Sequence, residues 1–189
     1  MEKIILASQS PRRSQLLQWA DVPFEVLVSD SDESYNESES FTQIAVHIAR
    51  NKALAVMAKS GAGRPVLAAD TIVVCNDTII GKPKDREEAI SFLKTLSGNI
   101  HTVVTGVVIL HNGKEQAFAD ETKVEFHPLT EDQISYYVDK YQPYDKAGAY
   151  AIQEWIGVVG IKSIHGDFYN VMGLPVSRVL QSLKEAGLL

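Results

Sequence analysis

An almost continuous run of apolar and β-branched residues extends from Val66 to Cys75, and Asp70 interrupts it. Such a run, bounded by turn residues, predicts a strand that is buried on both faces. An ionised carboxylate in a buried strand is costly unless a cation, a metal or several hydrogen-bond donors meet it. Asp70 is therefore a candidate for chemistry. Two other interpretations stay open: a structural carboxylate satisfied by backbone N–H groups, or a strand that ends at Ala69.

The residues before this run predict alternating strands and helices. Lys3–Ser8 and Phe24–Val28 have the composition of short strands. A helix is expected from Pro11 to Trp19, because Ser10 is a good N-cap and proline fits the first helical position. A longer helix is expected over Thr42–Lys59, where apolar residues recur on one face.

The residues after it continue the alternation. They predict helices from Asp85 to about Ser97, from Thr130 to about Tyr141 and over Pro175–Ala186. Strands are expected over His101–Leu110, Thr122–His127 and Gly157–Ile164. A hairpin turn is expected at Asn112-Gly113, with a return strand through Phe118. Strands that alternate with helices predict the α/β class. No linker or repeat divides the chain, so residues 1–189 are expected to form a single domain.

Composition narrows the classes of partner. The chain is 45% hydrophobic and carries a formal net charge of -6, which argues against nucleic acid as the main partner but permits a small anionic ligand. Cys75 is the only cysteine, which fits a reducing compartment. Neither a long apolar leader region nor a run of about 18 apolar residues is present, so we expect a cytoplasmic protein without a membrane partner.

Two arginines stand where a helix would favour acids. Arg12 and Arg13 fall in the first turn of the predicted helix, and cations there oppose the helix dipole. A bound anion would reverse that penalty, because free N–H groups and two guanidinium groups would then converge on it. The pattern favours a phosphate site. Solvation of both arginines, or pairing with the acidic loop that follows, is the alternative.

Two lysines and an acidic loop add to this picture. Lys52 falls inside the apolar stripe of its helix, so it either snorkels past the edge of the core or reaches an anion. Lys82 lies in a connection between a strand and a helix, where binding residues concentrate. The loop over Ser29–Ser40 is rich in carboxylates, and one of them brought toward Asp70 would complete a site for a divalent metal.

A segment near residue 150 suits contact with a nucleobase. Small residues around Gly148 allow close backbone approach, and Gln153 offers both an acceptor and donors. A buried glutamine satisfied by backbone groups is the equally plausible alternative. The chain has neither a glycine-rich dinucleotide or Walker fingerprint nor an evident Ser/His/Asp or Cys/His arrangement.

Five segments together resemble the Maf family, in order and across nearly the whole chain. They are Ala7-Ser-Gln-Ser-Pro-Arg-Arg13, Ala69-Asp-Thr71, Gly81-Lys-Pro83, Asp145-Lys-Ala-Gly-Ala-Tyr150 with Gln153, and Val171-Met-Gly-Leu-Pro175. The resemblance implies a mixed twisted sheet flanked by helices, with a central cleft, as in inosine triphosphate pyrophosphatases. It also implies a nucleoside triphosphate pyrophosphatase that clears nucleotide pools, uses Mg²⁺ or Mn²⁺ and forms a homodimer.

The resemblance also assigns roles to residues. It makes Asp70 the proton acceptor, with Glu33 beside it at the metal. It makes Arg12, Thr71 and Gln153 the residues that set substrate choice, and Thr71 with Gln153 is similar to the subgroup that acts on dTTP and UTP. The residues implied to cradle phosphates are Ser8, Arg13, Lys52 and Lys82. One departure from the family pattern is Glu154-Trp155, where a glycine-containing turn is common.

Two other functions are compatible with the same residues. One is a nucleotide-binding regulator of septum formation and cell division with little catalysis. A pure anion sensor has no need of a costly acid among cations, so Asp70 favours the enzyme. The other is a phosphomonoesterase, which would release inorganic phosphate instead of pyrophosphate.

Overall fold

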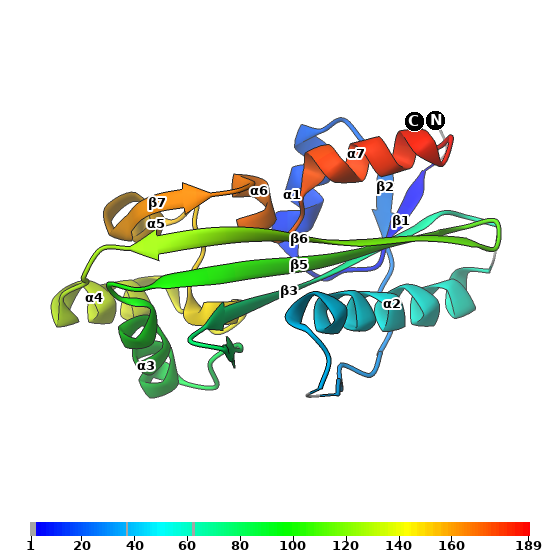
Figure 1. Ribbon diagram of the computed structural model, residues 1–189. Coiled ribbons are helices and arrows are strands. Elements are labelled where there is room, and N and C mark those ends of the chain that lie inside the picture. The colour runs from blue at the N-terminus through cyan, green and yellow to red at the C-terminus, as the bar shows by residue number, and fades with distance from the viewer. Residues whose placement is uncertain (1–2, 37, 62) are drawn as a thin grey trace. The chain divides into compact units, whose positions relative to one another are not determined.

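A computed structural model describes residues 3–36, 38–61 and 63–189 (Figure 1). The elements in chain order are β1 (Ile4–Leu6), α1 (Pro11–Trp19), β2 (Phe24–Val26), α2 (Phe41–Ser60), β3 (Val66–Cys75), β4 (Thr78–Ile80), α3 (Arg86–Leu96), β5 (Ile100–His111), β6 (Lys114–Phe126), α4 (Glu131–Tyr141), the 3-10 turn η1 (Ala147–Ala149), α5 (Trp155–Gly160), β7 (Ile161–His165), α6 (Phe168–Val171) and α7 (Val176–Glu185). The predicted α/β class, with a mixed sheet flanked by helices, is confirmed.

The sheet has seven strands in the order β2-β1-β3-β5-β6-β7, and β4 pairs with β3 off this path. Strand β1 runs parallel to both β2 and β3, whereas β4 runs antiparallel to β3, and β7 runs antiparallel to β6. The hairpin turn between β5 and β6 falls at Asn112-Gly113, as predicted. Both turn residues have positive φ, 49° and 71°, as a type I′ turn requires.

The chain folds into two compact units, and each is described by itself. Unit 1 comprises residues 1–70, 105–120 and 173–189. Unit 2 comprises residues 71–104 and 121–172. Strand β3 changes unit between Asp70 and Thr71, two residues that the sequence analysis had already singled out.

The core of unit 1 is formed where α2 packs on β1, β3 and β5. Its buried members are Ile5, Ala7, Ala49, Ala53, Val56, Val66, Ala68, Val108 and Leu110. Many of them are small, so the helix lies close to the strands. The closest approach is at Gly106 of β5, where a Cβ atom would stand 2.2 Å from the carbonyl carbon of Ala45. No side chain fits there, so glycine sets the distance between α2 and the sheet.

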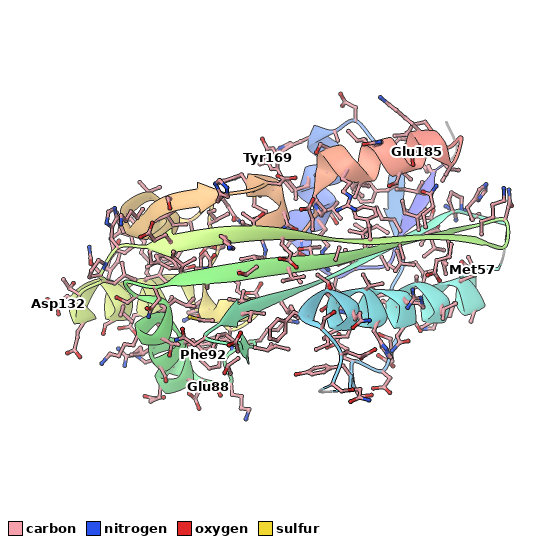
Figure 2. The ribbon with its side chains drawn as sticks, in the orientation of Figure 1. Met57, Glu88, Phe92, Asp132, Tyr169 and Glu185 are labelled. Carbon is pink, nitrogen blue, oxygen red and sulfur yellow. The ribbon has the colours of Figure 1, made fainter. Side chains whose placement is uncertain are left out.

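Helices cover both faces of the strands in unit 1. Figure 1 shows α2 on one side and α1 with α7 on the other. Figure 2 shows the same separation through Met57 of α2 and Glu185 of α7. Arg178 holds α7 to β6, because its guanidinium lies over the ring of Phe118 at 4.4 Å and donates to the Ala119 carbonyl oxygen at 2.7 Å.

Unit 2 combines aromatic packing with buried hydrogen bonds. The rings of His101, Phe126 and Tyr150 lie with centroids 5.1 to 5.4 Å apart, and His101 Nε2 is 2.7 Å from the Tyr150 hydroxyl. The wholly buried Asn170 donates to the Val103 carbonyl oxygen at 3.1 Å. Helix α3 packs against α4 and η1. Figure 2 shows Phe92 and Glu88 on α3 and Asp132 at the start of α4.

Two predicted elements were wrong. The separate strands through Phe118 and over Thr122–His127 are one continuous strand, β6, which is hydrogen-bonded to β5 in the sheet. The strand predicted over Gly157–Ile164 begins only at Ile161, after helix α5. The β-branched residues there favour a strand, but the N–H groups of Gly157 and Val158 donate to the Glu154 carbonyl oxygen and close a helical turn. Local backbone bonding overrides propensity at this point.

The interpretation in which a strand ends at Ala69 was also wrong. Strand β3 continues through Asp70 to Cys75. Asp70 and Thr71 are its only partly exposed residues, while the other eight are buried. Glu37 of the acidic loop lies outside the described residues.

Candidate active site

The order of the parallel strands creates a natural binding place in unit 1. Strand β1 lies between β2 and β3, so the chain leaves β1 toward α1 on one face of the sheet and enters β3 from α2 on the other (Figure 1). In open α/β sheets, ligands bind outside the carboxyl ends of strands at such a reversal. Strand β1 ends at Leu6, opposite Leu67, and the turn carrying Ser8 follows. Asp70 lies three residues beyond that last pair.

The alternation of β3 directs Asp70 toward α2. Side chains of a strand point to opposite faces in turn, so Asp70 shares a face with Val66 and Ala68. Those two residues belong to the core under α2. On the helix, Lys52 lies one turn after Ile48 and one turn before Val56, both buried. The apolar stripe thus brings the lysine to the carboxylate.

Lys52 joins two carboxylates that are far apart in the sequence. Its Nζ atom is 2.6 Å from Asp70 Oδ1 and 2.9 Å from Glu33 Oε1. The side chains of Lys52 and Asp70 are 18% and 16% exposed, whereas Glu33 is 60% exposed. Lys52 thus contacts a negatively charged group of the protein, the carboxylate of Asp70, and its binding of phosphate stays a prediction. The sheltered Lys52–Asp70 pair is screened less than a surface ion pair would be.

The acidic loop is fastened to α2 beside this pair. The Asn51 side-chain amide donates to the Asp32 carbonyl oxygen at 3.1 Å, and Lys59 donates to the Val28 carbonyl oxygen at 3.5 Å. Successive residues of the helix, Asn51 and Lys52, therefore hold successive residues of the loop, Asp32 and Glu33. This explains how Glu33 comes near Asp70 although the described residues 29–36 form neither helix nor strand.

Arg13 and Ser8 are two more of the predicted site residues in unit 1, and they contact each other. Arg13 is 7% exposed, and its guanidinium donates to the Ser8 hydroxyl at 3.0 Å and to the Gly173 carbonyl oxygen at 2.7 Å. Ser8 is also buried, and its hydroxyl accepts from the Ser10 N–H at 3.2 Å. Ser10 occupies the predicted N-cap position of α1, but its own side chain makes no capping bond. Arg13 thereby ties the β1–α1 turn to the segment before α7.

Charges of both signs surround Arg13. Burial lowers the pKa of the Arg13 guanidinium, the carboxylates of Asp70 and Glu33 raise it, and Arg12 lowers it further. These influences place Arg12, Asp70 and Glu33 within electrostatic reach of one group. Arg12, Arg13 and Lys52 give three cations against two carboxylates, an excess that suits a phosphate chain.

Unit 2 carries the other three predicted residues. Thr71 is partly exposed on β3, and Lys82 is exposed in the connection after β4. Gly148 links these two segments. Its N–H donates to the Gly81 carbonyl oxygen at 3.0 Å, and a Cβ atom on it would stand 3.1 Å from the Val73 side chain of β3. With φ of +71°, Gly148 fits a conformation that other residues rarely adopt.

Gln153 completes this group. Its side chain is exposed, although Ala151 and Ile152 before it are buried. The alternative of a buried glutamine satisfied by backbone groups was therefore wrong. An exposed amide after two buried residues is anchored by its neighbours and is available to a ligand.

The residues present fit a hard divalent cation. Glu33 and Asp70 direct one carboxylate oxygen each at the same atom, Lys52 Nζ, so two oxygen ligands converge on one point. Within residues 3–36, 38–61 and 63–189 no group of three or more His, Cys, Asp or Glu side chains could hold a metal. Mg²⁺ is commonly bound by one or two carboxylates together with substrate phosphates, and the pair of Glu33 and Asp70 matches that number of carboxylates.

Two features of the site were not predicted from the sequence. The Gly173 carbonyl accepts the bond from Arg13, although the two residues are 160 positions apart. The wholly buried Tyr137 of α4 contacts both Ala151 and Glu154. The signal for Tyr137 was its place on the apolar face of α4, because a buried phenol usually has a hydrogen-bond partner.

Comparisons with known proteins show the family of the chain. A family model described as Maf-like protein matches residues 3–186. A dTTP/UTP pyrophosphatase from Parabacteroides distasonis is 50% identical over 183 residues, covering 96% of this chain and 95% of that protein. One from Cytophaga hutchinsonii is 48% identical over 182 residues, covering 96% of this chain and 83% of that protein.

A solved structure supports the fold. The structure of the Staphylococcus aureus Ham1 protein matches with a TM-score of 0.52 at 18% identity, covering 98% of this chain and all of the other. In the described part of the chain, no helix has the length and apolar character needed to cross a membrane.

Proposed function

Because the chain belongs to the Maf-like protein family, we propose that it hydrolyses nucleoside triphosphates, with dTTP and UTP preferred, to the monophosphate and pyrophosphate. The observation that carries this proposal is the Lys52–Asp70 contact of 2.6 Å at the strand reversal of unit 1. A carboxylate held by a lysine, with two arginines nearby, combines a base with cations that bind phosphate. The regulator without catalysis is not favoured, since the relatives are named for an enzymatic activity.

The proposed reaction is an attack of water on the α-phosphorus. Asp70 accepts a proton from the water, whose oxygen forms a bond to the α-phosphorus. The bond from that phosphorus to the bridging oxygen breaks, and pyrophosphate leaves with the electron pair. Lys52 holds Asp70 through Oδ1, which makes Oδ2 the oxygen that faces the water in this proposal.

The remaining residues bind and orient the substrate. Ser8, Arg12, Arg13, Lys52 and Lys82 are assigned to the phosphates, because donors and cations stabilise the charge that grows on the departing pyrophosphate. Arg12, Thr71 and Gln153 are assigned to substrate choice. A divalent cation, Mg²⁺ or Mn²⁺, held by Glu33 and Asp70 would neutralise phosphate charge and acidify the attacking water.

Product analysis tests the proposal. The purified chain is incubated with dTTP, UTP, CTP, dATP and dGTP, with Mg²⁺ or with EDTA, and the products are separated. We expect dTTP and UTP to give monophosphate and pyrophosphate in equal amounts, with loss of turnover in EDTA. Binding without turnover across the panel would favour the regulator, and release of inorganic phosphate alone would favour the phosphomonoesterase.

A further inference from the structure

Unit 2 contains a sheltered polar network to which the proposed reaction gives no role. It joins Tyr137 of α4, Lys146 before η1 and Glu154, the residue that follows Gln153. The exposed fractions of the Lys146 and Glu154 side chains are 9% and 23%, and Tyr137 is wholly buried. Ionisable groups with so little exposure usually have a partner of opposite charge or hydrogen bonds, because removing a charge from water is costly.

The Tyr137 hydroxyl accepts one hydrogen bond and donates another. Its hydroxyl accepts from the Ala151 N–H at 3.1 Å and donates to Glu154 Oε2. An ionised carboxylate only accepts, so Glu154 fixes the hydroxyl as a donor toward itself and leaves its lone pairs to the Ala151 N–H. A bond to a charged acceptor is also stronger than one between neutral groups.

Lys146 balances the charge of Glu154. Its Nζ atom is 3.6 Å from Glu154 Oε1 and 2.8 Å from Asp145 Oδ1. The buried Lys146 therefore contacts two carboxylates, those of the 58% exposed Asp145 and of the more sheltered Glu154. The network therefore also fastens Asp145 and Lys146, which precede the turn at Gly148.

The network encloses the segment that presents Gln153. Residues Ala151 and Glu154 are both bound to the same tyrosine hydroxyl, and the Glu154 N–H donates back to the Ala151 carbonyl oxygen at 3.1 Å. This closed turn contains only Ile152 and Gln153 between its ends. Its backbone has little freedom, so the position from which the Gln153 side chain projects is fixed.

A fixed position matters for an amide that recognises a base. Uracil and thymine offer a carbonyl oxygen beside a ring N–H, whereas cytosine offers an amino group beside an unprotonated ring nitrogen. A glutamine amide can satisfy either pattern by rotating its terminal group. Discrimination therefore needs the side chain to start from a defined place, so that one orientation is better than the other.

We propose that Glu154 is a positioning residue for nucleobase selection, acting through Tyr137 on the turn that carries Gln153. This inference rests on the proposed function, because it assumes that Gln153 contacts the base. It adds a residue to the specificity apparatus without placing it against the substrate. A purely structural role, in which Glu154 only stabilises the start of α5, is the competing explanation.

The first test compares selectivity among variants. Values of kcat/KM for UTP and CTP are measured for the wild type, Glu154→Ala, Glu154→Gln and Tyr137→Phe. We expect the UTP/CTP ratio to fall about tenfold in Glu154→Ala and Tyr137→Phe, as for loss of one good hydrogen bond. The change should come from KM, with kcat for UTP within about twofold of the wild type. Glu154→Gln keeps an acceptor for Tyr137 and should retain most of the selectivity.

The second test asks whether Glu154 acts through Gln153. In a double-mutant cycle, Glu154→Ala should lower the UTP/CTP ratio in the wild-type background but change it little in the Gln153→Ala background. An equal fall in both backgrounds would mean that Glu154 acts elsewhere, and the proposal would fail.

A control variant and a stability measurement separate the outcomes. Glu131→Ala removes another carboxylate of unit 2, paired with Lys94 but 83% exposed, and should leave the ratio unchanged. Thermal unfolding identifies any variant that does not fold. If Glu154→Ala does not fold, Tyr137→Phe is used in its place. Wild-type protein that hydrolyses no triphosphate would overturn the proposed function itself. Normal hydrolysis with unaltered selectivity in every folded variant would overturn only the role of Glu154.

Discussion

The two units shelter polar groups in different ways. In unit 1 the partly buried pair, Lys52 and Asp70, is ionic and has a second carboxylate, Glu33, at 2.9 Å from the lysine. In unit 2, besides the ion pair of Lys146 with Glu154, the buried pair of His101 and Tyr150 is neutral, because burial lowers the pKa of His101 to about 4 and raises that of Tyr150. Burial is thus compensated in two ways, by an opposite charge at Lys52 and Asp70 and by loss of charge at His101 and Tyr150.

The strongest test of the ionic side is Asp70→Asn. Asparagine keeps the size and an acceptor for Lys52 but does not accept a proton. We expect kcat for UTP to fall about 1,000-fold or more, the range for loss of a general base. Nucleotide affinity, measured by calorimetry, should remain within about threefold, and unaltered turnover would remove Asp70 from the role of base.

Gly106→Ala tests whether a glycine is required for the close packing of α2 on the sheet that carries Asp70. The added Cβ would stand 2.2 Å from the carbonyl carbon of Ala45, so α2 would have to move away from β5. We expect the free energy of unfolding, from urea denaturation, to fall by about 3 kcal/mol. Gly63→Ala is the matched control, because its Cβ would meet nothing within 4 Å. Equal stability of the two variants would contradict the packing described for Gly106.

Lys52→Gln removes the cation between the two carboxylates. Without it, Asp70 and Glu33 lose a shared partner, and the phosphates lose a positive charge. We expect kcat for UTP to fall about 100-fold. Arg50→Gln on the same helix is the control, since Arg50 pairs with Glu115 through an exposed contact. A similar loss in both variants would indicate a general effect on α2.

The neutral side is tested by pH. The pKa of His101, about 4 in the folded chain, lies below the ordinary value of 6.5, so the unfolded chain binds more protons between these limits. The free energy of unfolding should therefore fall as the pH drops below 6.5, by about 2 kcal/mol at pH 5 through this group. Urea denaturation at pH 7.5, 6 and 5 measures the slope. In His101→Gln the fall in the free energy of unfolding at pH 5 should be smaller by about 2 kcal/mol. The same fall in both proteins would contradict the burial of a neutral His101.

Local signals sufficed for most of the fold. Helix α1 begins at Pro11 and ends at Trp19 as predicted, and α4 has the expected capping box of Thr130 and Gln133. The α/β class of the chain followed from the alternation of predicted strands and helices alone. Helix α5 was missed because its β-branched residues favour a strand in isolation, while the Glu154 carbonyl oxygen decides the outcome.

The candidate site was predictable wherever a residue broke a local rule. A carboxylate in a buried strand and a lysine in an apolar stripe each pointed to a partner, and Asp70 and Lys52 proved to be partners of each other. Tyr137 and the Gly173 carbonyl broke no local rule, because a tyrosine fits the apolar face of α4 and a carbonyl is present at every residue. Their roles depend on contacts between distant segments, which no local pattern encodes.

Isotope labelling tests most directly the central claim of the proposed mechanism, that water attacks the α-phosphorus. UTP is hydrolysed in water enriched in ¹⁸O, and the products are analysed by mass spectrometry. One labelled oxygen should appear in the monophosphate and none in the pyrophosphate. Label in the pyrophosphate would place the attack on the β-phosphorus and contradict the proposed mechanism.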